Sequence, residues 1–480
     1  MRRLWRLLAA HRDYRLLLTA GVVSLTGDWV LLIGLTYAVY TLTGSTLASG
    51  TMLLAAYVPQ VVLGSVAGVF VDRWNRRLTM VATDLLMAAG LVPLVFVHDA
   101  GRVWIVYLVV LWESSIEPFF TPAERAVVPH LVDADELVAA NGANGQIQGV
   151  ARLGGSALGG LVAGFGGLAA VALLDGVSFL VSAVLLLGIR SLPRAVDRGR
   201  RLADVGREWL SGMRLLLRKP LLRLTFTFIA VVSVGEGVVT TLFAPFLTGV
   251  LHASAPAYGL ILALQAVGGI AGGLVVAAYG QRLSPRALVG VGGLLFGATD
   301  LLLFLYPLVW HVLWPAGVLI ILAGIPGAAV VAGYTSTLQA GAADSHRGRV
   351  FGAVATMSAG TGLVGIAAAG VLGGVLGIVP VIAVQGAGYV LAGTFVVIAL
   401  RSPLHGQGGQ PVDDGEGAER NILERDGEPQ RGEAVEQGGV GDPHLHAGQG
   451  SAEAVVDAVA ERDMGGDGPG DVDVVEVVAE

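Results

Sequence analysis

Long apolar runs separated by short polar turns constrain this chain more than any other feature. A helix needs about 20 apolar residues to cross roughly 30 Å of hydrocarbon, and runs of that length recur along most of the sequence. With 54% hydrophobic and 14% charged residues and 70 glycines, the composition exceeds what a soluble core requires. We therefore predict an all-α integral membrane protein with twelve spans, near 14–42, 47–71, 78–97, 103–123, 141–164, 168–190, 221–249, 256–281, 286–306, 311–335, 350–375 and 378–400.

Basic residues gather in one set of alternate turns. Arginines crowd the N-terminal segment, the turn at 73–77 and the stretch from Arg190 to Arg223, whereas the opposite set of turns contains one arginine, Arg102, and no lysine. Because short loops rich in Lys and Arg stay in the cytoplasm, both termini are expected to be cytoplasmic.

The chain divides into four regions. VSLTGD, which ends at Asp28, recurs as VSVGE, which ends at Glu236, so the two halves resemble the parallel repeats of transporters. The basic stretch between the halves is expected to lie on anionic lipid headgroups. The Gly-rich, acidic end of the chain is expected to be disordered. The predicted regions are a six-helix bundle at 1–190, a connector at 191–220, a second six-helix bundle at 221–400 and a tail at 401–480.

The sequence lacks the residues and motifs that several kinds of chemistry require. There is no cysteine, which excludes disulfides, thiolate catalysis and cysteine zinc sites. The one lysine, Lys219, is not in a P-loop, so transport would draw on an ion gradient or a separate ATPase subunit. No GxSxG, HExxH or paired-aspartate protease pattern occurs. We expect no enzymatic activity, no cofactor and no metal site.

Three motifs resemble those of the major facilitator superfamily, and within it the bacterial efflux branch that includes macrolide efflux proteins and the enterobactin exporter. They are GVFVDRWNRR at 68–77, FFTPAERAVVPHLVDADELVAANG at 119–142 and HRGRVFG at 346–352. The resemblance covers 14–400 and implies two pseudo-symmetric six-helix bundles around a central cavity in a bacterial plasma membrane. Asn75 replaces the usual Gly of the first motif, and Ser156 replaces Pro in GSALGG.

The first motif predicts a cytoplasmic gate. Asp72 ends the second span, where it can interact with the positive dipole end of a neighbouring helix; the resemblance suggests the helix that opens at HRGRVFG. Arg73 or Arg125 could hold that carboxylate, and Arg77 could pair with Asp84. The alternative is that these arginines only determine topology. The predicted gate comprises Asp72, Arg73, Arg76, Arg77, Asp84 and Arg125.

Ionisable residues at membrane depth predict the substrate and proton site. Each such residue raises the free energy of membrane insertion by ~2.5–3.5 kcal/mol at a helix centre unless it contacts water or a partner. Glu113 and Glu117 lie one turn apart, so both cannot ionise cheaply, and one becomes a candidate proton carrier. The resemblance places three spans with acids around the central cavity. The predicted site comprises Asp28, Glu113, Glu117, Arg152 and Glu236.

Structural alternatives stay open at these positions. Glu113 could pair with Arg152 to join two spans, and Asp28 and Glu236 could each make a helix–helix hydrogen bond. Asp175 and Asp300, predicted nearer the outer ends of their spans, are interpreted as structural. Aromatic candidates for the cavity wall are Trp29, Tyr37, Trp112, Phe119 and Phe243.

Together these observations predict a secondary active transporter that exports small amphiphilic, cationic or weakly basic compounds by proton antiport. The expected partners are a small-molecule substrate, a coupling proton and the lipid bilayer, with no nucleic acid, and the protein is expected to be a monomer. Alternatives are a siderophore or metabolite exporter of the same fold, and a non-transporting sensor or scaffold that recruits partners through the acidic tail.

Overall fold

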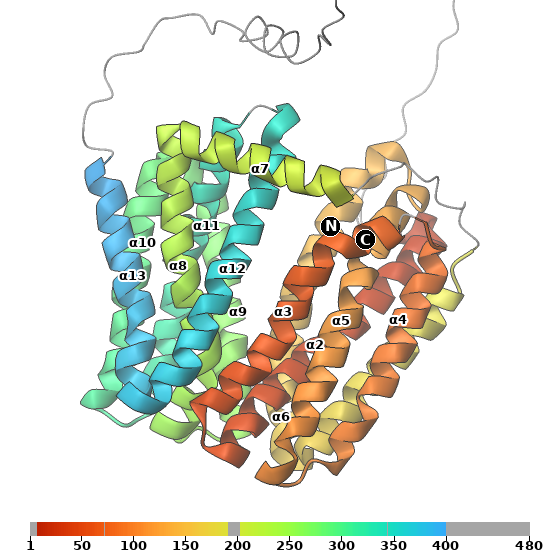
Figure 1. Cartoon of the computed structure of the whole chain (residues 1–480), viewed down its shortest axis with the longest axis horizontal. Coiled ribbons are helices and arrows are strands. Elements are labelled where there is room, and N and C mark those ends of the chain that lie inside the picture. The colour runs from red at the N-terminus through yellow and green to blue at the C-terminus, as the bar shows by residue number, and fades with distance from the viewer. Residues whose placement is uncertain (1–6, 72, 191–201, 343, 400–480) are drawn as a thin grey trace, which may run out of the picture. The chain divides into compact units, whose positions relative to one another are not determined.

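The computed structural model describes residues 7–71, 73–190, 202–342 and 344–399. These residues belong to one compact unit of helices joined by short turns (Figure 1). The predicted tail at 401–480 lies outside the described residues.

The N-terminal bundle contains one helix too long to cross a membrane once. Gly167 interrupts α6 with φ 62° and ψ −162°, a conformation open essentially only to glycine. The 51 residues of α6 would reach about 77 Å at 1.5 Å per residue, more than twice the hydrocarbon thickness. The two arms therefore correspond to the spans predicted at 141–164 and 168–190. The helices of this bundle are α2 (Arg12–Thr43), α3 (Thr46–Val71), α4 (Arg76–Gly90), α5 (Val103–Val127) and α6 (Leu137–Leu187).

The C-terminal bundle follows a separate amphipathic helix, α7 (Leu202–Arg218), within the predicted connector. Gly212 of α7 packs so closely on α12 that an added Cβ would collide with the carbonyl group of Arg349. Eleven helices in the described residues are long and apolar enough to cross a membrane, and the two arms of α6 bring the crossings to the twelve predicted. The helices of the second bundle are α8 (Pro220–Pro245), α9 (Ala255–Tyr279), α10 (Pro285–Leu305), α11 (Trp314–Gly341), α12 (Asp344–Leu376) and α13 (Ile378–Ala399).

Local capping explains where several helices begin and end. Gly44 adopts a left-handed conformation, φ 62°, and its N–H donates to the carbonyl oxygen of Tyr40 at the end of α2. Asn75 caps α4 by accepting a hydrogen bond from the N–H of Leu78 at 3.1 Å. The Asn that departs from the motif therefore has a structural role, since Asn is among the best N-caps.

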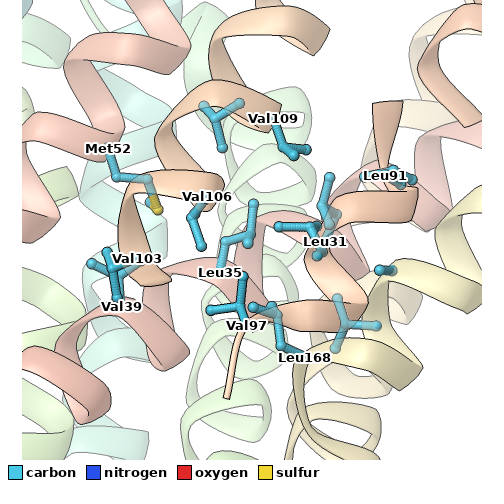
Figure 2. Close-up of a cluster of buried hydrophobic side chains, with 14 of the residues drawn as sticks. Leu31, Leu35, Val39, Met52, Leu91, Val97, Val103, Val106, Val109 and Leu168 are labelled. Atoms are coloured by element: carbon cyan, nitrogen blue, oxygen red, sulfur yellow. The ribbon is translucent and has the colours of Figure 1, made fainter. Parts of the chain in front are cut away.

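Apolar side chains from all five helices form the core of the N-terminal bundle. Leu31 and Leu35 of α2 meet Met52 of α3 and Val106 of α5, with Leu168 of α6 close by (Figure 2). The same face of α2 that contributes this core continues toward Asp28, so the core sets the position of that carboxylate.

The two bundles touch at glycine pairs. Gly160 of α6 lies against Gly259 of α9, and Gly50 of α3 lies against Gly370 of α12. The hydroxyl group of Thr46 donates to the carbonyl oxygen of Gly370 at 3.0 Å. These contacts lie toward the end of the bundles that contains Gly44 and Gly167, which we call the opposite end. The end at which α7 lies is called the α7 end, and there the ribbons of α3 and α12 diverge (Figure 1).

Candidate functional site

Two adjoining cavities in the N-terminal bundle are lined by carboxylates. The larger measures about 440 Å³ and the smaller about 180 Å³. Asp28, Met87 and Glu117 line both cavities, so the two spaces meet at these side chains. Helices α2, α4 and α5 contribute to both walls, α3 adds to the smaller cavity, and α6 adds to the larger.

The smaller cavity brings together three of the predicted site residues. Asp28 of α2 and Glu113 and Glu117 of α5 line it, together with Tyr57 and Gln60 of α3. The amide of Gln60 donates to Oε2 of Glu117 at 2.6 Å. Oε1 of Glu113 is buried and has no hydrogen-bond partner among the described residues. A carboxylate in that position can take up a proton or attract a cation.

The larger cavity adds acids that lie toward the α7 end. Asp84 of α4 is 1% exposed, lines this cavity, and its Oδ2 has no hydrogen-bond partner among the described residues. Glu124 of α5 also lines the cavity. Arg125 is the one lysine or arginine in this lining, and the smaller cavity has none. The lining therefore carries an excess of acidic groups.

Asp175 was predicted near the outer end of its span, but the structure places it close to Asp28 and therefore close to this cluster of acids. It is fully buried on the second arm of α6, where Oγ of Ser178 donates to its Oδ1 at 3.0 Å. An added Cβ at Gly27 would collide with that carboxylate, so glycine is required at this position beside Asp28. Oδ2 of Asp175 has no partner in the described part of the chain.

Arg152 is not paired with Glu113. Its guanidinium lies 5.3 Å from the centre of the Trp29 ring and donates to Oε1 of Gln265 on α9. The arginine therefore connects the first arm of α6 to both α2 and the other bundle. The pairing of Glu113 with Arg152, left open by the sequence, is not made in this structure.

Glu236 is held inside the C-terminal bundle. Its Oε1 accepts hydrogen bonds from Nε2 of Gln385 at 2.9 Å and from the Tyr389 hydroxyl at 2.8 Å. Both donors lie on α13, so the helix–helix hydrogen bond considered for this residue is present. Asp300 is 4% exposed on α10, and its Oδ2 has no partner among the described residues. Asp28 and Glu236, which end the two repeated motifs, therefore have different surroundings in the structure.

The aromatic residues predicted to line the cavity wall lie in different parts of the structure. Tyr37 stacks on Tyr258 of α9, with ring centres 6.3 Å apart, at the contact between the bundles. Phe243 is buried in the core of the C-terminal bundle.

Trp112 and Phe119 instead pack toward α4. The indole N–H of Trp112 donates to the carbonyl oxygen of Leu86 at 2.9 Å. Phe119 stacks on Trp74, with ring centres 5.8 Å apart. Neither of these side chains lines the acidic cavities, so the prediction that they form the cavity wall is not met there.

The predicted gate is only partly described. Asp72 lies outside the described residues. Arg76 donates to the carbonyl oxygen of Ala126 at 3.1 Å and lies 3.0 Å from Nε2 of His130. Arg77 donates to the carbonyl oxygen of Leu187, at the end of α6, rather than pairing with Asp84. The predicted Arg77–Asp84 pair is therefore wrong for this conformation, and these arginines fasten α4 to α5 and α6.

The other two gate arginines lie on different surfaces. Arg73 lines a cavity of about 670 Å³ between α4 and α5, together with Trp74 and Phe119. Arg125 lines the larger acidic cavity, next to Glu124.

Sequence reasoning missed Glu124 and Gln60, and it gave Gln265 no role beyond the pore or helix packing. Glu124 follows Glu117 by seven residues, which places it on the same face of a helix, so the helical period could have found it. Gln60 and Gln265 become important only through the helices that pack against them, and no spacing in the sequence reports that.

Comparison with known proteins shows which family this chain matches. The model of the transmembrane secretion effector family matches residues 8–430. Macrolide efflux protein A of Streptococcus pyogenes is 30% identical over 142 residues, which are 29% of this chain and 35% of that protein. The MFS-type transporter YfiS of Bacillus subtilis (strain 168) is 28% identical over 151 residues, which are 31% of this chain and 36% of that protein. The matched segments span about a third of these relatives.

Solved structures agree with the fold over a greater length. A bacterial homologue of the iron transporter ferroportin in an inward-facing state superposes with a TM-score of 0.66 at 16% identity, over 82% of this chain and 99% of that one. The nucleoside transporter NupG superposes with a TM-score of 0.65 at 12% identity, over 82% of this chain and 100% of that one. Because the family model covers most of the sequence, the chain belongs to the transmembrane secretion effector family of the major facilitator superfamily, whose members are transporters rather than enzymes.

Proposed function

We propose that this secondary transporter exports small amphiphilic cations in exchange for protons. The observation that carries the proposal is the pair of acid-lined cavities in the N-terminal bundle, where Asp28 and Glu117 are shared and Oε1 of Glu113 has no partner among the described residues. The match to macrolide efflux protein A supports export as the direction of transport.

The energetics of the cavities favour exchange of one positive charge for another. A charged carboxylate at membrane depth costs ~2.5–3.5 kcal/mol, so three or four together cost on the order of 10 kcal/mol unless neutralised. Arg125 is the one base in the lining, and Arg152 is engaged by Gln265 and Trp29. The cavity is therefore stabilised by bound protons or by a bound cation, and competition between the two is the basis of antiport.

Alternating access follows from the contacts between the bundles. The glycine pairs Gly160–Gly259 and Gly50–Gly370 lie toward the opposite end, and the Thr46 hydrogen bond lies beside them. We infer that this conformation is open at the α7 end. The clustered arginines support a cytoplasmic location for the α7 end and for both termini, and on this proposal the acidic cavities load substrate from inside a bacterial cell.

Substrate preference follows from the sign of the field. An excess of carboxylates attracts a lipophilic cation and repels a multiply charged anion. Weakly basic, amine-bearing compounds of the macrolide type are therefore the expected substrate class.

A transport comparison tests this proposal. Proteoliposomes with purified wild-type chain, Asp28→Asn or Asp99→Asn would be loaded with a lipophilic amine or with a neutral compound of similar size. Asp99 lies in an exposed turn at the opposite end and serves as the matched control. We expect Asp28→Asn to reduce amine transport much more than neutral transport and Asp99→Asn to change neither. Equal loss for both compounds, or preferential transport of an anionic siderophore, would overturn the proposed substrate class.

A further inference from the structure

A second cluster of ligating side chains lies at the α7 end, away from the acidic cavities. Nε2 of His11 is 2.6 Å from Oε2 of Glu136. Asp133 completes a trio in which one ligand atom from each residue lies within 4.8 Å of the others. His11 and Glu136 are partly buried, and Asp133 is exposed.

The trio joins two segments far apart in the sequence. His11 occupies the N-cap of α2, Asp133 the N-cap of the short helix Ala134–Glu136, and Glu136 the N-cap of α6. None of these side chains caps its own helix with a hydrogen bond, so all three remain available to a common ligand.

The backbone frame beneath the trio is firmly packed. Tyr14, one turn into α2, is fully buried, and its hydroxyl donates to the carbonyl oxygen of Ala140 on α6 at 2.9 Å. The same hydroxyl lies 3.2 Å from Oδ1 of Asn144. These bonds fix the starts of α2 and α6 against each other, so the three side chains can meet without backbone movement.

We propose that His11, Asp133 and Glu136 form a binding site for a divalent transition-metal ion of the Zn²⁺ type. One imidazole nitrogen and two carboxylate oxygens are ligands that Zn²⁺ accepts, at about 2.0–2.2 Å each, which places neighbouring ligand atoms roughly 3–3.5 Å apart. The observed separations require side-chain adjustments of about 1.5 Å or less to reach that geometry. Solvent at the exposed Asp133 side supplies the remaining coordination position.

Binding would fasten α2 to α6 within the N-terminal bundle. Because both helices belong to the same bundle, the ion stabilises that bundle without tying it to the other one.

Zn²⁺ titration of the purified, tag-free full-length chain in detergent tests the proposal. The absence of cysteine removes the thiols that would otherwise compete for the ion. The variants are His11→Ala, Asp133→Asn and Glu136→Gln, and the matched controls are Asp135→Asn, in the same short helix, and His98→Ala, in a turn at the opposite end. We expect each ligand variant to weaken Zn²⁺ binding by ~10-fold or more and each control to leave it unchanged.

Thermal unfolding separates loss of the site from loss of the fold. Zn²⁺ should raise the melting temperature of the wild-type chain and of Asp135→Asn, but not that of Asp133→Asn, whose exposed side chain can be changed without disturbing the core. Unchanged affinity in His11→Ala and Asp133→Asn would overturn the proposal. So would wild-type binding weaker than about 1 mM, a free energy of only about 4 kcal/mol.

Discussion

Gly160→Ala would add a methyl group at a close contact between the two bundles. A Cβ at Gly160 would lie 2.5 Å from the carbonyl oxygen of Ala255 and 2.7 Å from the Cα of Gly259, both on α9. Ordinary van der Waals contacts are at 3.4–4 Å, so α6 and α9 must separate by about 1 Å. Overpacking of this kind costs ~1–3 kcal/mol. Because the cost falls on the conformation in which α6 and α9 touch, the population of that conformation should fall by a factor of ~5–150.

Spin labels at the opposite end measure this shift. The chain has no cysteine, so Trp104→Cys and Val309→Cys introduce two labels without further changes. Both positions are exposed, at 57% and 77%, and they lie on different bundles. We expect Gly160→Ala to move the distance distribution between the labels toward longer values. Gly154→Ala, on the same arm of α6 with nothing within 4 Å of the added Cβ, is the matched control. Identical distributions for the two variants would refute the reasoning.

Three further substitutions test separate contacts. Asn75→Ala removes the cap on the N–H of Leu78 and should lower stability by ~1 kcal/mol, measured as a lower melting temperature in detergent that Asn75→Asp largely restores. Arg152→Lys loses the planar donor to Gln265 and should lengthen the same label distance, though less than Gly160→Ala; an unchanged distance would show that this contact does not hold the bundles together. Glu236→Gln keeps an oxygen acceptor for its donors on α13 and should retain folding and most transport; complete loss of transport with normal folding would assign Glu236 to the coupling site instead.

The fold was predictable because hydrocarbon imposes a length on every span. The apolar runs located the helices, and the two runs on either side of Gly167 were correctly separated at the point where its non-helical backbone divides α6 into two arms. The amphipathic helix α7 was expected only as a basic connector, since its arginines gave no indication that Gly212 packs on α12.

The site was less predictable because its residues meet through tertiary packing. The spacing of Glu113 and Glu117 placed both on one face of α5, and both line the smaller cavity. Asp175 was interpreted as structural from its position in the sequence, yet the close approach at Gly27 brings it beside Asp28. The partner of Arg152 lies on the other bundle, at a distance that no periodicity within one helix can report.

Proton movement caused by substrate is the most direct test of the central claim, that the carboxylates of the N-terminal bundle exchange protons for a cationic substrate. A pH-sensitive dye trapped in proteoliposomes would report proton flux when a lipophilic amine is added under an imposed pH gradient. Glu113→Gln removes the charge of the carboxylate whose Oε1 has no partner among the described residues while keeping its shape, and Ser115→Ala, two residues along α5, is the control. We predict that the amine accelerates proton flux in the wild-type chain and in Ser115→Ala but not in Glu113→Gln. Equal amine-driven flux in all three would contradict the account.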